Sequence, residues 1–259
     1  MALVRWSPDA DPASPDAFVA RAFGARLDDL SVDFHGPLDA AIGGVLRVCL
    51  SDAGGRAFEG REIAEWTLPK RRQGLIAVAV ATEGPMRARR ADCPAPTCGA
   101  QAELLLDLRE FRRDWRADRT EAVLPGGRRL ALRLPRPADL ATAAEGGARG
   151  AEAAARALAL GEAPDGDDWI EAADAALSAA DLLGDLDLNA DCPACGGPIS
   201  VPLALEPWLS GELARASVRL MDEIHVIAAA YHWTEADILA LPEGRRRHYI
   251  SRIMEGRAA

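Results

Sequence analysis

Four of the chain's five cysteines fall into two short motifs that constrain the fold more than any other feature of the sequence. Each motif opens with Asp-Cys-Pro, ends at a glycine, and leads into an alternating apolar run, at 102–108 and at 199–205. The cysteines are Cys93, Cys98, Cys192 and Cys195. This pattern is typical of zinc knuckles, because two thiolates on a tight turn bind one ion side by side and the glycine permits the backbone reversal.

Two knuckles supply four sulfurs, which predicts a closed tetrahedral zinc site with no position left for water or substrate. We therefore interpret the metal as a structural staple. Two alternatives stay open: cysteines buried as small hydrophobic residues, and a redox C-x-x-C pair. A redox pair sits where a strand meets a helix, whereas both pairs here precede strand-like runs. The first pair has the wider C-x4-C spacing, and Cys49, in an apolar helical stretch, is expected in the core.

The composition favours a helix-rich protein that is kept in the cytoplasm. Hydrophobic residues make up 49% of the 259 residues but aromatic residues only 5%, and alanine and leucine dominate. The formal net charge of −10 argues against attraction to nucleic acid or to anionic lipid. No stretch resembles a membrane span or a secretory signal, and a cytoplasmic setting keeps thiols reduced and available to metal.

The predicted fold class is α+β and mostly α-helical, with a small zinc-ribbon β unit, an inserted helical segment and a C-terminal helical bundle. An N-terminal arm and helices occupy 1–64. The other expected units are a helix with the first knuckle and strand (65–108), a hairpin and helical insertion (109–184), the second knuckle (185–206) and the C-terminal helices (207–259).

Apolar spacing places the individual elements. Residues 1–14 are expected to be a loose arm, and residues 15–24 a short helix that ends at a glycine. Further helices are expected at 37–50, 69–80, 138–145, 148–160, 169–183, 207–231, 236–241 and from 242 onward, and a β-hairpin at 120–134. The basic triplet Lys70-Arg71-Arg72 is expected to be a solvated face at the start of its helix.

The segment 222–250 carries a resemblance to a known family. It has a Tyr-x-Trp pair, then Thr-Glu-x-x-Ile-Leu-x-Leu-Pro, then an arginine cluster followed by tyrosine. This pattern resembles the baseplate hub assembly chaperones of the T-even phage type, which are encoded in clusters for phage-tail-like contractile injection systems. The resemblance extends over about 65–108 and 183–252. It implies a cytoplasmic factor that assembles a baseplate or hub without catalysing a reaction.

The same segment offers candidate residues for binding a protein partner, such as a baseplate or hub component. They are Tyr231, Trp233, Arg245, Arg246 and Arg247. Large aromatic anchors and arginines on an acidic protein suit an acidic partner surface. The alternatives are that the aromatic residues pack the last helix onto the long one and that the arginines form a solvated face.

No catalytic residues are expected, because the four histidines and the glycine-containing segments match no catalytic motif. The main rival is a zinc-ribbon protein that binds nucleic acid or acts as a regulator. Its phosphate contacts would come from 70–72, 87–90 or 245–247. The net charge and the aspartates beside the second knuckle argue against that rival.

Overall fold

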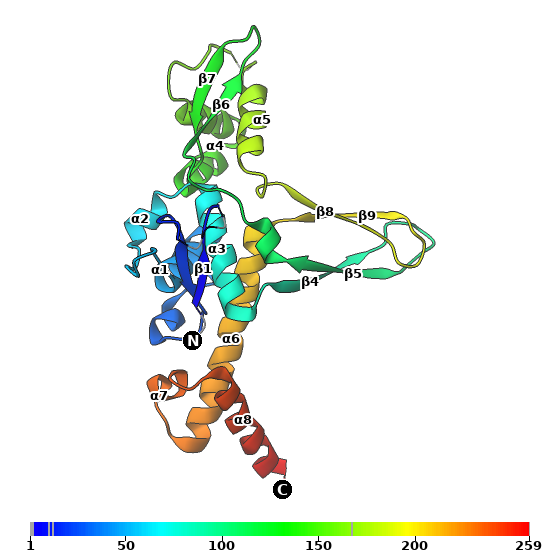
Figure 1. Cartoon of the computed structure of the whole chain (residues 1–259). Coiled ribbons are helices and arrows are strands. Elements are labelled where there is room, and N and C mark those ends of the chain that lie inside the picture. The colour runs from blue at the N-terminus through cyan, green and yellow to red at the C-terminus, as the bar shows by residue number, and fades with distance from the viewer. Residues whose placement is uncertain (1–2, 10, 12, 167, 259) are drawn as a thin grey trace.

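The computed structural model describes residues 3–258 apart from 10, 12 and 167. It is an α+β protein whose strands form small antiparallel sheets. Its long central helices support three projections: two β-hairpins on one side, a lobe at one end and a helical lobe at the other (Figure 1). The predicted α+β class is confirmed.

The body surrounds one helix. Its elements are β1 (Leu3–Trp6), β2 (Phe18–Arg21), the 3-10 helix η1 (Leu27–Ser31), α1 (Leu38–Cys49), β3 (Leu50–Ser51), α2 (Gly60–Ala64) and α3 (Leu68–Glu83). Residues 71–80 of α3 are all buried, which is the pattern of a helix enclosed on every side. Gly74 lets α1 approach closely, because an added Cβ would lie 2.9 Å from Leu50 and 3.0 Å from Leu46.

The predictions of a loose arm and a short helix at the N-terminus are wrong. β1 pairs antiparallel with β2, and β2 pairs with β3. Trp6 is fully buried and its indole N–H donates to the Oε1 of Gln73 at 2.9 Å, while Phe18 stacks between two tryptophans, at 66 and 115. These partners are remote in sequence, so the strand assignment depends on contacts that local spacing does not contain.

The prediction that Lys70, Arg71 and Arg72 form a solvated face is also wrong. Arg71 and Arg72 are buried, at 3% and 5% exposure, and Lys70 lies 4.5 Å above the ring of Trp66. Arg71 donates to the carboxylate of Asp39 and to backbone carbonyls, and Arg72 pairs with two acidic residues. Enclosure of α3 buries its first turn, and the ion pairs compensate the buried charges.

The projecting hairpins form what we call the arm. Its strands are β4 (Met86–Asp92), β5 (Gln101–Asp107), β8 (Leu186–Asp191) and β9 (Pro198–Leu203). β4 pairs with β5 and β8 with β9, each antiparallel and in continuous register. The predicted strands that leave each cysteine motif are confirmed.

The insertion lobe lies between the two hairpins in the sequence and follows the 3-10 helix η2 (Leu108–Phe111). It contains β6 (Arg119–Val123), β7 (Arg129–Arg133), α4 (Pro137–Leu158) and α5 (Ile170–Ala180). Trp169 anchors a separate apolar cluster between the β6–β7 hairpin and α5. The predicted hairpin at 120–134 is confirmed, and one continuous helix, α4, stands where two helices were predicted at 138–145 and 148–160.

The C-terminal lobe is built on the far half of α6 (Leu205–Tyr231) with α7 (Glu235–Leu239) and α8 (Glu243–Ala258). The near half of α6 joins the body through Leu205, Leu209 and Leu213. The far half extends beyond it and forms its own cluster with α7 and α8 (Figure 1). Thr234 and Asp237 bond reciprocally and form a capping box at the start of α7.

Candidate metal centre

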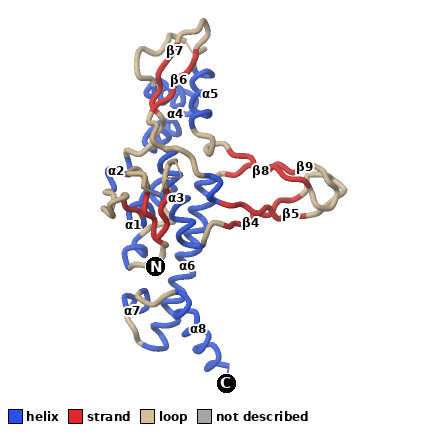
Figure 2. The backbone as a smooth tube through the Cα atoms, in the orientation of Figure 1, coloured by secondary structure: helices blue, strands red, loops and turns tan. Residues whose placement is uncertain are grey.

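The four cysteines of the two motifs meet at the end of the arm. Cys93 and Cys98 lie in the turn between β4 and β5, and Cys192 and Cys195 lie in the turn between β8 and β9. The two hairpins leave the body apart and converge at their turns (Figure 2). Sequence segments separated by the whole insertion lobe are therefore brought together at this point.

Each turn is closed by its own backbone. The N–H of Cys93 donates to the Ala100 carbonyl at 2.9 Å, and the N–H of Cys192 donates to the Gly197 carbonyl at 2.8 Å. Gly99 and Gly196 have φ of 60° and 70°, a left-handed conformation that glycine adopts without steric cost. The glycine after each second cysteine thus has the role that the sequence predicts for it.

The sulfur positions suit a single ion. The Sγ atoms of Cys93 and Cys195 are 3.7 Å apart, as are those of Cys98 and Cys192, and all four lie within 4.8 Å of one another. Tetrahedral coordination with metal–sulfur bonds of about 2.3 Å places sulfurs about 3.8 Å apart. A disulfide would need about 2.05 Å, so the thiols are free and arranged around a common centre.

The electrostatics of the thiols also point to a cation. Backbone N–H groups of Cys195 and Ala194 lower the pKa of the Cys192 thiol to about 7. The Ala95 N–H lowers the pKa of Cys93, but desolvation and the neighbouring sulfurs outweigh it and raise that pKa to about 12. Thiolates at these distances repel one another, and a positive ion between them would compensate their charge.

Little apolar packing supports this end of the arm. The buried residues beside the sulfurs are Ala91, Ala102, Cys192 and Ile199. Cys192 is buried, Cys195 is exposed, and the other two cysteines are intermediate. Small side chains of this kind contribute little hydrophobic stabilisation, so a bound metal would be the main link between the two turns.

The fifth cysteine takes no part in the centre. Cys49 is buried in the body at 2% exposure, as the sequence predicts. Burial raises the pKa of its thiol to about 12, so it remains a neutral core residue at physiological pH.

The candidate partner-binding residues lie in the C-terminal lobe, where the aromatic residues form a cluster and the arginines differ in burial. Tyr231 stacks on Trp233 at 5.1 Å, and Tyr249, which the sequence analysis did not single out, packs edge-on against both. Tyr249 lies four residues after Arg245, and this spacing in the sequence indicates that the two side chains share one face of a helix. The three rings form one cluster with an exposed edge, since Tyr231 is 38% exposed.

The three arginines of the cluster differ in burial and in partners. Arg246 is buried and donates to the Glu223 carboxylate at 2.8 Å and to the Leu241 carbonyl at 3.0 Å. Arg245 and Arg247 are exposed; Arg247 pairs with Glu243 on the same helix. The prediction that all three arginines contact a partner is therefore corrected, because Arg246 fastens α8 to α6.

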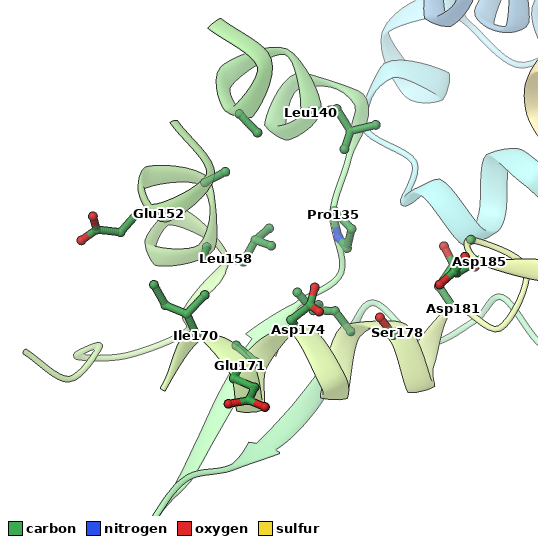
Figure 3. A pocket seen from close by; sticks show the side chains of 16 residues that line it. Pro135, Leu140, Glu152, Leu158, Ile170, Glu171, Asp174, Ser178, Asp181 and Asp185 are labelled. Atoms are coloured by element: carbon green, nitrogen blue, oxygen red, sulfur yellow. The ribbon is translucent and has the colours of Figure 1, made fainter. Parts of the chain in front are cut away.

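A cavity lies away from the cysteines, in the insertion lobe. It has a volume of about 930 Å³ between α4 and α5. Leu140, Leu158 and Ile170 are among its lining residues, and the Asp174 carboxylate points toward its interior, whereas that of Glu171 points away from it (Figure 3). The cavity shares no residue with the metal centre.

No protein-family model, no curated protein and no solved structure matches the chain. In the part of the chain that the structure describes, the four cysteines are the one group of His, Cys, Asp and Glu side chains arranged to hold a metal ion. In that same part, no helix combines the length and the apolar character needed to cross a membrane. The functional assignment therefore rests on residues and geometry.

Proposed function

We propose that this chain is a zinc-stapled, non-enzymatic factor that assembles the baseplate or hub of a phage-tail-like contractile injection system. The metal is zinc, because a cluster of four thiolates with tetrahedral spacing suits this ion, and an iron–sulfur centre is the alternative that metal analysis separates. Four sulfurs complete the coordination, so the ion has no open position for a substrate. Its role is to hold the two turns of the arm together.

The proposed assembly role rests on the C-terminal lobe and its exposed side chains. The segment 222–250, which resembles the baseplate hub assembly chaperones, forms this lobe. Its aromatic cluster, Tyr231, Trp233 and Tyr249, is partly exposed at the end of α6. The guanidinium of the exposed Arg245 donates to the Tyr249 hydroxyl at 3.4 Å, and the exposed Arg247 lies two residues further along α8. Partly exposed aromatic rings bordered by arginine are the residue types that dominate protein–protein binding energy.

Each of the three basic segments proposed for contact with nucleic acid loses part of its available charge. Arg71 and Arg72 are buried in ion pairs, and Arg246 is buried against Glu223. In the segment 87–90, Arg87 is also buried and pairs with Glu212. Four of the nine basic side chains that these segments offered for phosphate are therefore neutralised inside the protein.

The test is an Arg245→Glu/Arg247→Glu variant that leaves Arg246 in place. In the native host we expect it to co-purify with no baseplate or hub component and to yield few assembled particles. The control is Arg47→Glu/Arg61→Glu, which makes the same charge change at exposed positions of α1 and α2. Zinc content and thermal melting should be unchanged in both variants.

Normal particle assembly after deletion of the whole gene would contradict the proposed machine. Normal co-purification by the Arg245→Glu/Arg247→Glu variant would contradict the proposed docking surface. A loss of particles in the control variant as well would show that the charge reversal acts without regard to position.

A further inference from the structure

A second charged site lies where the arm joins the body. It is a cleft of about 620 Å³ between β4, the end of β9 and the first turns of α6. Three arginines line it: Arg89 and Arg90 on β4, and Arg215 on α6. The sequence suggested Arg89 and Arg90 only as phosphate contacts within 87–90, and it did not suggest Arg215, which comes from a distant segment.

These three arginines lack the partners that other arginines of the chain have. Among the described residues, no ion pair or hydrogen bond is formed by the side chains of Arg89, Arg90 or Arg215, and the Nε of Arg89 is buried without an acceptor. Arg87, on the same strand, shows the contrast: it donates to Glu212 at 2.8 Å and to several backbone carbonyls. A buried donor without an acceptor is unfavourable unless a ligand satisfies it.

The cleft is therefore positive in a protein whose formal net charge is −10. The one acidic side chain in its lining is Glu212, and Arg87 already neutralises it. We infer that the cleft binds a short acidic segment of a partner protein, with carboxylates held by Arg89 and Arg215. Guanidinium groups bind carboxylates through paired N–H donors, which gives orientation as well as attraction.

The remaining lining favours a peptide over a nucleic acid. Pro202, Pro207 and the half-buried Trp208 give the cleft an apolar wall that suits the side chains of an extended peptide. A nucleic acid needs a longer basic track, and the negative charge of the whole molecule repels a long polyanion. This inference does not depend on the proposed machine, since a synthetic probe tests it directly.

The experiment measures the binding of a fluorescein-labelled oligoglutamate peptide to the full-length zinc-loaded protein by fluorescence anisotropy at low salt. We expect saturable binding that weakens as salt is added. The Arg89→Glu/Arg215→Glu variant should lose at least about tenfold in affinity. The Arg47→Glu/Arg61→Glu variant makes an equal charge change away from the cleft and should bind nearly as well as the unmodified chain.

The milder Arg89→Gln/Arg215→Gln variant keeps the test decisive if charge reversal impairs folding. It should also lose affinity while zinc content and melting temperature stay unchanged. Absence of saturable oligoglutamate binding, or equal losses in the cleft and control variants, would overturn the inference. Tighter arginine-dependent binding of single-stranded DNA than of oligoglutamate would also overturn it and would assign the cleft to nucleic acid.

Discussion

The body and the arm bury very different kinds of residue. In the body, α3 is enclosed on every side, and large side chains such as Leu75, Ile76 and Trp6 are fully buried. At the end of the arm, the buried residues are two alanines, one isoleucine and one cysteine. The body has enough apolar surface to fold by hydrophobic burial, whereas the arm tip has little beyond the four sulfurs.

This difference indicates that a bound metal would stabilise the arm more than the body. A single two-stranded hairpin is marginally stable in water at best, and the arm consists of two such hairpins. A bound ion would join Cys98 to Cys192, 94 positions apart, and so reinforce the small apolar cluster at this end. Loss of metal should loosen the arm locally and leave the body folded.

The largest effect should come from removing half of the ligands. The Cys192→Ser/Cys195→Ser variant should fall from about one zinc per chain to nearly none, because two remaining thiolates cannot complete a tetrahedral site. Elemental analysis of protein purified without added metal measures this. Cys49→Ala is the matched control and should keep its zinc. Full zinc content in the double variant would rule out the site.

The body should respond to a core cavity without losing its metal. Leu75→Ala should lower the free energy of unfolding by about 4 kcal/mol, because Leu75 is fully buried in α3. Denaturant titration followed by circular dichroism measures the change. Folded protein of this variant should still carry zinc; zinc loss from the folded variant would mean that body and arm are not independent.

A smaller effect is expected where α3 meets the insertion lobe and α6. Arg72 pairs with Asp181 at 2.5 Å and with Glu206 at 3.1 Å. Arg72→Gln should lower the free energy of unfolding by about 2 kcal/mol, since it leaves two partly buried carboxylates without their cation. Lys70→Gln, which loses a cation–π contact, should cost only about 0.5 kcal/mol. Equal losses would contradict the distinct roles of these neighbours.

The effect expected in the C-terminal lobe is local. Thr234→Ala removes the cap of α7 and should cost about 1 kcal/mol, seen as faster hydrogen exchange in 234–241. The Thr234 hydroxyl and N–H lower the pKa of Asp237. The stabilisation from Asp237 is therefore present above the ordinary aspartate pKa and is lost as pH falls through the lowered value. Unchanged exchange at neutral pH would mean that the cap is dispensable.

The sequence predicts what short-range patterns encode. Repeated Asp-Cys-Pro motifs with glycine identify the cysteine cluster, and apolar spacing locates α1, α3, α6 and the β6–β7 hairpin. These features depend on residues only a few positions apart. The same is true of the α7 cap.

The errors concern contacts between distant segments. Trp6 lies beside Gln73, and Arg72 lies beside Asp181, so neither the N-terminal strand nor the burial of the triplet could be read from local spacing. The pairing of Arg246 with Glu223 and the cleft that gathers Arg89 with Arg215 have the same origin. A run of charged residues in a sequence does not show which of its members form buried ion pairs.

Hydrogen exchange before and after zinc removal tests the central claim most directly. Peptides that cover 86–107 and 186–203 should exchange much faster after a strong chelator strips the metal, and peptides from α3 should keep their protection. Restoring zinc should restore the slow exchange in the arm. Unchanged exchange in the arm of metal-free protein, or simultaneous loss of protection in α3, would contradict the account of an arm held by metal and a body held by its core.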